Sequence, residues 1–229
     1  MESNKKHIVI FSHAFGVKRD DRGLLDGPQG IAPALRAEGL QTVLFDYNDI
    51  DEVNNTLTVY PLSVQAEKLR EVVESVKREN PEAIVDIVAH SQGCLVAALA
   101  HVQGIRKSIF LAPSLIQNID RMIETFRARP GTEIDFEGVS KLARLDGTLT
   151  LVPKEFWTER SSMEPISLYN AFAQQSEIFL INAKQDDVLK RGDTSLLDSS
   201  IVVQDLEGDH SFNGDARGPL IEKIKEILL

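Results

Sequence analysis

Hydrophobic and polar positions divide the chain into short apolar runs and longer stretches with helical periodicity. The apolar runs are rich in β-branched residues, as expected of buried strands. They occupy residues 7–11, 41–47, 84–88, 107–112, 177–183 and 200–206. Helical patterns lie between or after them at 31–38, 61–79, 94–100 and 219–229, with a short one near 194–197. Because parallel strands need helical crossovers, this alternation predicts a parallel sheet with helices on both faces.

The alternation breaks between Ser114 and Gln175, a segment too long for a single crossover. It is mixed in polarity and contains Trp157, the one tryptophan of the chain, with several other aromatic residues. We predict a single domain over 1–229, with this segment (about 114–175) inserted as a cap. The cap aromatics could line a site or form the cap's own small core, and the core is the favoured interpretation.

The pattern Ala89-His90-Ser91-Gln92-Gly93 lies where the strand at 84–88 gives way to an apolar helix. A serine on a sharp strand-to-helix turn, with small residues two positions away on each side, is typical of a nucleophile elbow. The small side chains are needed because the turn presses the backbone against its neighbours. The sequence therefore predicts Ser91 as a nucleophile.

A serine hydroxyl needs a base, and the base needs a carboxylate that orients it. His210 follows the last strand in a glycine-containing turn and is the predicted base. Asp186 and Asp187 both follow the strand at 177–183, at the sheet edge where open α/β sheets place their sites. The spacing favours Asp186, with Asp187 left as the alternative.

Two backbone N–H groups are needed to stabilise the oxyanion that forms on the attacked carbonyl. The N–H of Gln92, directly after the nucleophile, is the first predicted donor. The second should come from the loop after the first strand, where we expect Phe15 to supply it.

These motifs resemble the α/β-hydrolase superfamily across nearly all of the chain. Within it the sequence is most similar to small bacterial carboxylesterases of the feruloyl or cinnamoyl esterase kind. The resemblance rests on His13-Ala14-Phe15-Gly16, Phe45-Asp46-Tyr47, Ala89-His90-Ser91-Gln92-Gly93, Ala183-Lys184-Gln185-Asp186-Asp187-Val188 and Gly208-Asp209-His210-Ser211-Phe212. Ala14 and Ala89 depart from it, because the family usually has glycine at both positions.

The resemblance implies a Ser-His-Asp mechanism through an acyl-enzyme and no cofactor. We expect a small-molecule ester as the substrate, because a departing alkoxide needs less assistance than an amine. A thioesterase, lipase, peptidase or C–C bond hydrolase with the same triad is the alternative within enzymes. A non-catalytic ligand-binding protein on the same fold is the alternative outside them.

The composition limits the classes of binding partner and the compartment that we expect. A formal net charge of −10 disfavours nucleic acid and anionic membranes, which basic patches recognise. The single cysteine, Cys94, excludes an intrachain disulfide and suits a reducing compartment. No apolar run has the length of a signal sequence core or a membrane span, so we expect a cytoplasmic protein. The oligomeric state is left open.

The remaining polar residues carry weaker indications. The segment Lys18-Arg19-Asp20-Asp21-Arg22 could meet an anionic substrate group, although a solvated, self-paired loop is favoured. We expect Cys94 to be a small core residue, and neither His13 nor His90 needs a catalytic role. No clustered metal ligands and no phosphate-binding or dinucleotide motif are present in the sequence.

Overall fold

The computed structural model describes residues 5–117, 119–190 and 192–229. Its main sheet has six strands, all paired in parallel, in the order β10-β9-β6-β5-β1-β2. The strands are β1 (His7–Ser12), β2 (Gln41–Val43), β5 (Ile84–His90), β6 (Lys107–Leu111), β9 (Glu177–Ala183) and β10 (Val202–Leu206). The predicted parallel sheet is confirmed.

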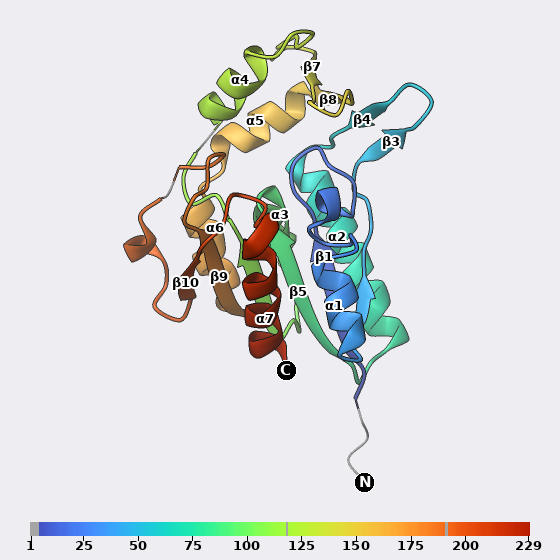
Figure 1. Cartoon of the computed structure of the whole chain (residues 1–229), viewed down its shortest axis with the longest axis vertical. Coiled ribbons are helices and arrows are strands. Elements are labelled where there is room, and N and C mark those ends of the chain that lie inside the picture. Colours follow the sequence, from blue (N-terminus) through green and yellow to red (C-terminus); the bar gives the residue numbers. More distant parts are fainter. Residues whose placement is uncertain (1–4, 118, 191) are drawn as a thin grey trace.

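Helices cover both faces of this sheet (Figure 1). One face carries α2 (Leu62–Glu79), α3 (Gln92–Ala100) and α6 (Pro165–Phe172). The other carries α1 (Ile31–Ala37) and α7 (Arg217–Leu228). Short 3-10 turns occupy Asp21–Gly23, Thr194–Leu196 and Gly214–Ala216. No helix within the described ranges is both long enough and apolar enough to cross a membrane.

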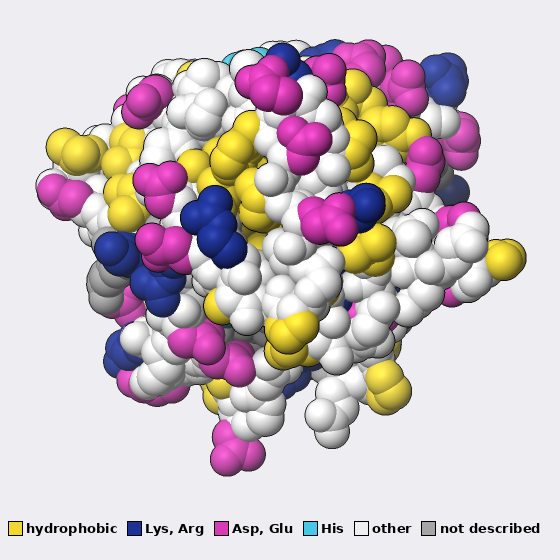
Figure 2. All heavy atoms as spheres, turned by 90° about the horizontal axis from the view of Figure 1, so that it is seen from above, with side chains coloured by type: hydrophobic (Ala, Val, Ile, Leu, Met, Phe, Trp, Pro, Cys, Tyr) yellow, Lys and Arg dark blue, Asp and Glu magenta, His cyan; other side chains and the backbone are white. Residues whose placement is uncertain are grey.

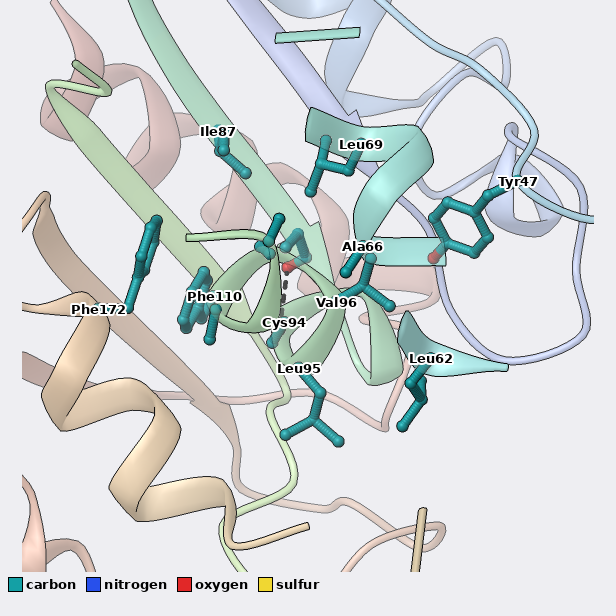
Figure 3. Packing of buried hydrophobic residues seen from close by; sticks show 14 of the residues in the cluster. Tyr47, Leu62, Ala66, Leu69, Ile87, Cys94, Leu95, Val96, Phe110 and Phe172 are labelled. Carbon is teal, nitrogen blue, oxygen red and sulfur yellow. Dashed lines mark hydrogen bonds between the residues drawn. The ribbon is translucent and has the colours of Figure 1, made fainter. Parts of the chain in front are cut away.

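Strand alternation explains the two cores. In β1, Ile10 points to the α2–α3–α6 side, whereas Val9 and Phe11 point to the α1–α7 side. Both sets are buried, which is why the strand appears in the sequence as a continuous apolar run. The α3 helix is apolar on all sides because it lies between the sheet, α2 and α6, as the packing around Cys94 and Val96 shows (Figure 3).

One carboxylate is buried in the middle of the sheet. Asp86 in β5 has no exposed surface. Its Oδ1 accepts hydrogen bonds from Nε of Arg106 (3.0 Å) and the backbone N–H of Lys107 (2.9 Å), and its Oδ2 lies 2.6 Å from Nε2 of His7. Burial opposes ionisation, but these hydrogen bonds and the Arg106 charge hold the pKa of Asp86 below its ordinary value. These contacts of Asp86 link β1, β5 and β6 near their amino-terminal ends, away from the candidate site.

The strand expected over 41–47 is shorter than predicted. Pairing with β1 ends at Val43, opposite Ile10. Tyr47 is nevertheless fully buried, stacks on the ring of His13, and donates its hydroxyl hydrogen bond to the His13 carbonyl. Side-chain packing therefore replaces strand pairing over the apolar residues after Val43.

A second sheet of four strands lies beyond the carboxyl ends of the main strands (Figure 1). Its order is β3-β4-β8-β7, from β3 (Asp49–Asp51), β4 (Thr56–Thr58), β7 (Val139–Ala143) and β8 (Leu149–Pro153). The helices α4 (Ile119–Arg127) and α5 (Lys154–Ser162) flank it. We propose that this sheet and these two helices form the cap, so that the hairpin at 49–58 joins it from outside 114–175 and α6 remains with the main sheet.

The turn from β5 into α3 is possible because Gly93 has no side chain. A Cβ atom there would clash with the carbonyl oxygen of Ser12 and lie 2.7 Å from that of His13. Both obstacles are backbone atoms of the strand that carries the site loop, and neither can rotate away. The distance between α3 and β1 therefore depends on this glycine.

We predict that Gly93→Ala lowers the free energy of unfolding by about 1–3 kcal/mol, through overpacking against β1. The matched control is Gly218→Ala in α7, where a Cβ meets no atom within 4 Å. That variant should gain about 0.5–1 kcal/mol from a less flexible unfolded chain. Urea denaturation of both variants measures the difference, and equal midpoints would refute this account of the turn.

Candidate active site

Ser91 stands at the tip of the turn between β5 and α3. Its backbone has φ 53° and ψ −119°, a conformation that non-glycine residues rarely adopt. The strained backbone is held by the N–H of Ser91, which donates to the carbonyl of Leu111 at 2.9 Å. Ala89 and Gly93, on either side, are fully or nearly buried. This geometry agrees with the turn expected from the sequence.

The structure brings Ser91, His210 and Asp186 together in one line of hydrogen bonds. Oγ of Ser91 lies 2.9 Å from Nε2 of His210, and Nδ1 of His210 lies 2.7 Å from Oδ2 of Asp186. His210 follows β10 and Asp186 follows β9, so both come from the carboxyl edge of the sheet. With Nδ1 protonated, His210 donates to the carboxylate and accepts the hydrogen bond of the serine hydroxyl.

Asp186, rather than Asp187, is the carboxylate that faces His210. Its second oxygen accepts the backbone N–H groups of Val188 (2.9 Å) and Leu189 (2.8 Å). Burial opposes ionisation, but the hydrogen bond and charge of His210 with these N–H groups lower the pKa of Asp186 below its ordinary value. Asp187 is exposed, and its backbone carbonyl accepts a hydrogen bond from Arg121.

The loop after β1 lies against the site. Phe15 and Gln92 both line the pocket at Ser91. In the described part of the chain, the backbone N–H groups of these two residues have no hydrogen-bond partner. The neighbouring N–H of Ala14 is instead bound to the carboxylate of Asp21, at 3.0 Å. The loop therefore leaves the Phe15 N–H free while it anchors the residue before it.

A second buried acid–histidine pair lies beneath the first and was missed from the sequence. Nδ1 of His90 is 2.7 Å from Oδ2 of Asp21, and Nε2 of His90 is 2.9 Å from the carbonyl oxygen of His210. Both side chains are almost completely buried. The pair thus joins the site loop, through Ala14, to the backbone of His210.

Burial favours the neutral forms of Asp21 and His90, but the interactions of their charged forms together outweigh it. Desolvation opposes both charges, whereas the Coulombic attraction and the hydrogen bond lower the pKa of Asp21 and raise that of His90. Asp21 escaped sequence analysis because it belongs to a charged segment and has a positive φ of 48°, which no periodicity reveals. Within that segment Lys18 and Arg19 are exposed, as expected, but the prediction of a self-paired loop is wrong: Lys18 pairs with Glu52 and Arg19 with Asp46, both outside the segment.

Other polar residues singled out from the sequence are structural. His13 is buried, and desolvation lowers its pKa despite the Ala14 carbonyl beside Nδ1. Cys94 is a buried core residue whose thiol pKa is raised well above its ordinary value by burial. In the described residues no group of three or more His, Cys, Asp or Glu side chains is placed to hold a metal ion.

A pocket of about 340 Å³ opens at Ser91 and His210. The helix α4 contributes an apolar wall to it, through Ile119, Met122 and Phe126. Phe156, Trp157, Tyr169 and Phe172, all from the segment 114–175, do not line it. They are buried, as expected of core residues, but in the large cluster on the α2–α3–α6 side of the main sheet and not in a separate core of the cap. Figure 2 shows the molecule from the cap side, where apolar atoms are exposed between acidic and basic side chains.

Comparison with known proteins gives a partial match in sequence and full matches in structure. Residues 48–118 match the family model of the T6SS Tle3 phospholipase effector domain. This match covers less than half of the chain. No curated protein sequence matches the chain.

Solved structures similar to the chain cover almost all of it at low identity. Est1E from Butyrivibrio proteoclasticus is 16% identical with a TM-score of 0.68, over 98% of this chain and 88% of that one. An esterase of Pyrococcus furiosus is 15% identical with a TM-score of 0.62, over 97% and 82%. An alpha-beta serine hydrolase homologue from Coxiella burnetii is 16% identical with a TM-score of 0.56, over 100% and 88%.

The parallel sheet, the serine turn and these neighbours together establish that the chain has the α/β-hydrolase fold. The resemblance stated from the sequence motifs is thereby confirmed at the level of the fold.

The Asp21–His90 pair predicts a specific dependence of stability on pH. A raised His90 pKa contributes stability that is complete below 6.5, its ordinary value, and is lost as pH rises through the higher folded pKa. The lowered Asp21 pKa contributes stability that is present above 3.8 and is lost as pH falls through the lower folded pKa. The pair should therefore stabilise the fold most between these two values.

Asp21→Asn should accordingly lower the melting temperature most at pH 4–6.5, with a smaller effect at pH 9. Asp20→Asn removes the same charge beside the pair and serves as the control. Differential scanning calorimetry across this range measures both, and an effect of Asp21→Asn that does not vary with pH would contradict an ionised pair.

Proposed function

We propose that this protein is a serine carboxylesterase that cleaves a small-molecule ester through an acyl-enzyme. The observation that carries the proposal is the unbroken hydrogen-bond line from Ser91 through His210 to Asp186, at the floor of a pocket. A buried line of hydrogen-bonded polar groups that opens on to a pocket is the arrangement of a nucleophile with its base and orienting acid.

In the acylation step, Ser91 attacks the ester carbonyl while Nε2 of His210 takes the serine proton. The imidazolium is balanced by Asp186, whose lowered pKa keeps it ionised at neutral pH. His210 then gives the proton to the departing alkoxide, and the alcohol leaves. Water, deprotonated by the same histidine, attacks the acyl-enzyme and releases the acid.

The oxyanion of both tetrahedral intermediates is assigned to the backbone N–H groups of Gln92 and Phe15. Their lack of other partners in the described chain supports this role, because a preorganised donor should not be occupied before the substrate binds. Each donor is expected to contribute about 3–4 kcal/mol to transition-state stabilisation. No metal or cofactor is required by this sequence of steps.

The structural neighbours support an ester as substrate, since they include Est1E and an esterase of Pyrococcus furiosus. The match of residues 48–118 to a phospholipase effector model favours a lipid ester as the second candidate. Esters of increasing acyl length distinguish the two, because a pocket of about 340 Å³ suits a short acyl group.

The decisive experiment is labelling with a fluorophosphonate probe at neutral pH, with the modified peptide located by mass spectrometry. Labelling should occur at Ser91 in the wild type and be absent in Ser91→Ala. If a folded wild-type sample neither reacts with the probe nor cleaves a short p-nitrophenyl ester, the esterase proposal fails and a non-catalytic binding protein replaces it.

The two adjacent aspartates give a matched test of the triad. Asp186→Asn should reduce kcat for p-nitrophenyl acetate by about 10⁴-fold, because the amide no longer holds the tautomer of His210 that accepts the serine proton. Asp187→Asn removes the same charge one residue away and should have a far smaller effect. Comparable losses in the two variants would show that Asp186 is not the orienting carboxylate.

A further inference from the structure

The pocket at Ser91 is basic although the protein carries a formal net charge of −10. Four arginines line it: Arg22, Arg129, Arg144 and Arg160. Two acidic residues line it as well, and one of these, Asp21, is occupied by His90. The other, Asp187, is exposed at the rim. The lining therefore has an excess of positive charge that the rest of the chain does not share.

Three of these arginines have no carboxylate partner within the described residues. Arg160 donates to the side chains of Gln117 (2.7 Å) and Ser114 (3.3 Å), and Arg129 lies over the ring of Phe126. Arg22 is the exception, since it pairs with Asp146 at 3.7 Å where both are more than half exposed. Unpaired guanidinium groups around an apolar pocket are unusual, because arginine is normally matched by a carboxylate or another anion when water is excluded.

Of the four arginines, Arg144 is the one held beside Phe15, the proposed oxyanion donor. Its Nε donates to Oγ1 of Thr150 (2.9 Å), and one terminal nitrogen donates to the Phe15 carbonyl (3.2 Å). The guanidinium lies 5.1 Å above the ring of Phe15 and 4.8 Å above that of Phe126. These contacts orient a planar cation beside the proposed oxyanion donor. Among the described residues, the other terminal nitrogen of Arg144 has no hydrogen-bond partner.

The chain around Arg144 is shaped to admit it. Gly16 has a φ of 59°, and a Cβ at that position would clash with a terminal nitrogen of Arg144. Burial, and then the charges of Arg22 and Arg129, lower the pKa of Arg144 to about 9, with Asp146 acting in the opposite direction. The side chain is thus still charged at neutral pH, and an anion beside it would relieve the repulsion among these arginines.

We infer that the ester substrate carries an anionic group, a carboxylate or a phosphate, which binds in the pocket against Arg144 and Arg129. This inference rests on the proposed esterase function and specifies its substrate class. A guanidinium with a terminal nitrogen left to donate suits a carboxylate or phosphate, which accepts charge-assisted hydrogen bonds. The apolar wall from α4 would hold the uncharged remainder of the substrate.

The test compares esters that differ only in charge. Mono-p-nitrophenyl glutarate and its terminal carboxamide place the group on the acyl side, and 3-acetoxybenzoate and 3-acetoxybenzamide place it on the alcohol side. In at least one pair the wild type should prefer the anionic ester by about tenfold or more in kcat/KM, the range that a charge-assisted hydrogen bond supplies. Free glutarate or inorganic phosphate, at constant ionic strength, should compete with a neutral ester.

Two variants separate binding from structure. Arg144→Gln should remove the preference and the competition, and Arg144→Lys should retain part of both. A purely structural role would instead lower kcat/KM equally for the charged and the neutral ester. If Arg144→Gln does not fold, Arg129→Gln, which gives up a single long hydrogen bond to the Ala143 carbonyl, should still reduce the preference.

The inference is overturned if neither anionic ester is preferred and neither free anion competes, or if the preference is unchanged in both glutamine variants. Cleavage of neutral esters without any charge preference would remove this inference and leave the esterase proposal standing. Absence of probe labelling at Ser91 and of all ester cleavage would instead remove the esterase proposal itself.

Discussion

The contact on which the site depends is the approach of α3 to β1 at Gly93. The turn after β5 gives Ser91 a positive φ and raises its hydroxyl above the sheet edge. That turn closes only because a glycine lies against the carbonyl oxygens of Ser12 and His13. The serine and the loop that bears Phe15 are thereby held at a fixed separation. The same close packing that stabilises the sheet thus sets the geometry in which an attacked carbonyl would lie between them.

Two acid–histidine pairs lie near this contact, and they differ in what they hold in place. In one, Asp186 orients His210 toward Ser91. In the other, the buried pair of Asp21 and His90 bonds to the carbonyl of His210 and to the N–H before Phe15. The second pair holds both the proposed base and the proposed oxyanion loop from below. Besides the pH-dependent stability expected from it, this pair fixes the positions of both segments.

Much of this arrangement could be predicted from the sequence, because its signals are local. Apolar runs predicted the strands, and the small residues on either side of Ser91 predicted the turn. The Asp21–His90 pair could not be predicted, since its members are 69 positions apart in the sequence and the positive φ of Asp21 leaves no periodic pattern. The hairpin at 49–58 was likewise missed as part of the second sheet, because its partner β8 lies far along the chain. Pairing between distant segments has no signature within either one.

Arg144 has a further consequence for the behaviour of the molecule. It belongs to the connection between β7 and β8, yet it bonds to the Phe15 carbonyl in the loop after β1. A displacement of the small sheet would therefore pull on the peptide next to the N–H that faces the pocket. The position of the second sheet and that of the loop after β1 are therefore linked through one side chain. If substrate enters by movement of the second sheet, the loop after β1 would regain its position only when that sheet returns.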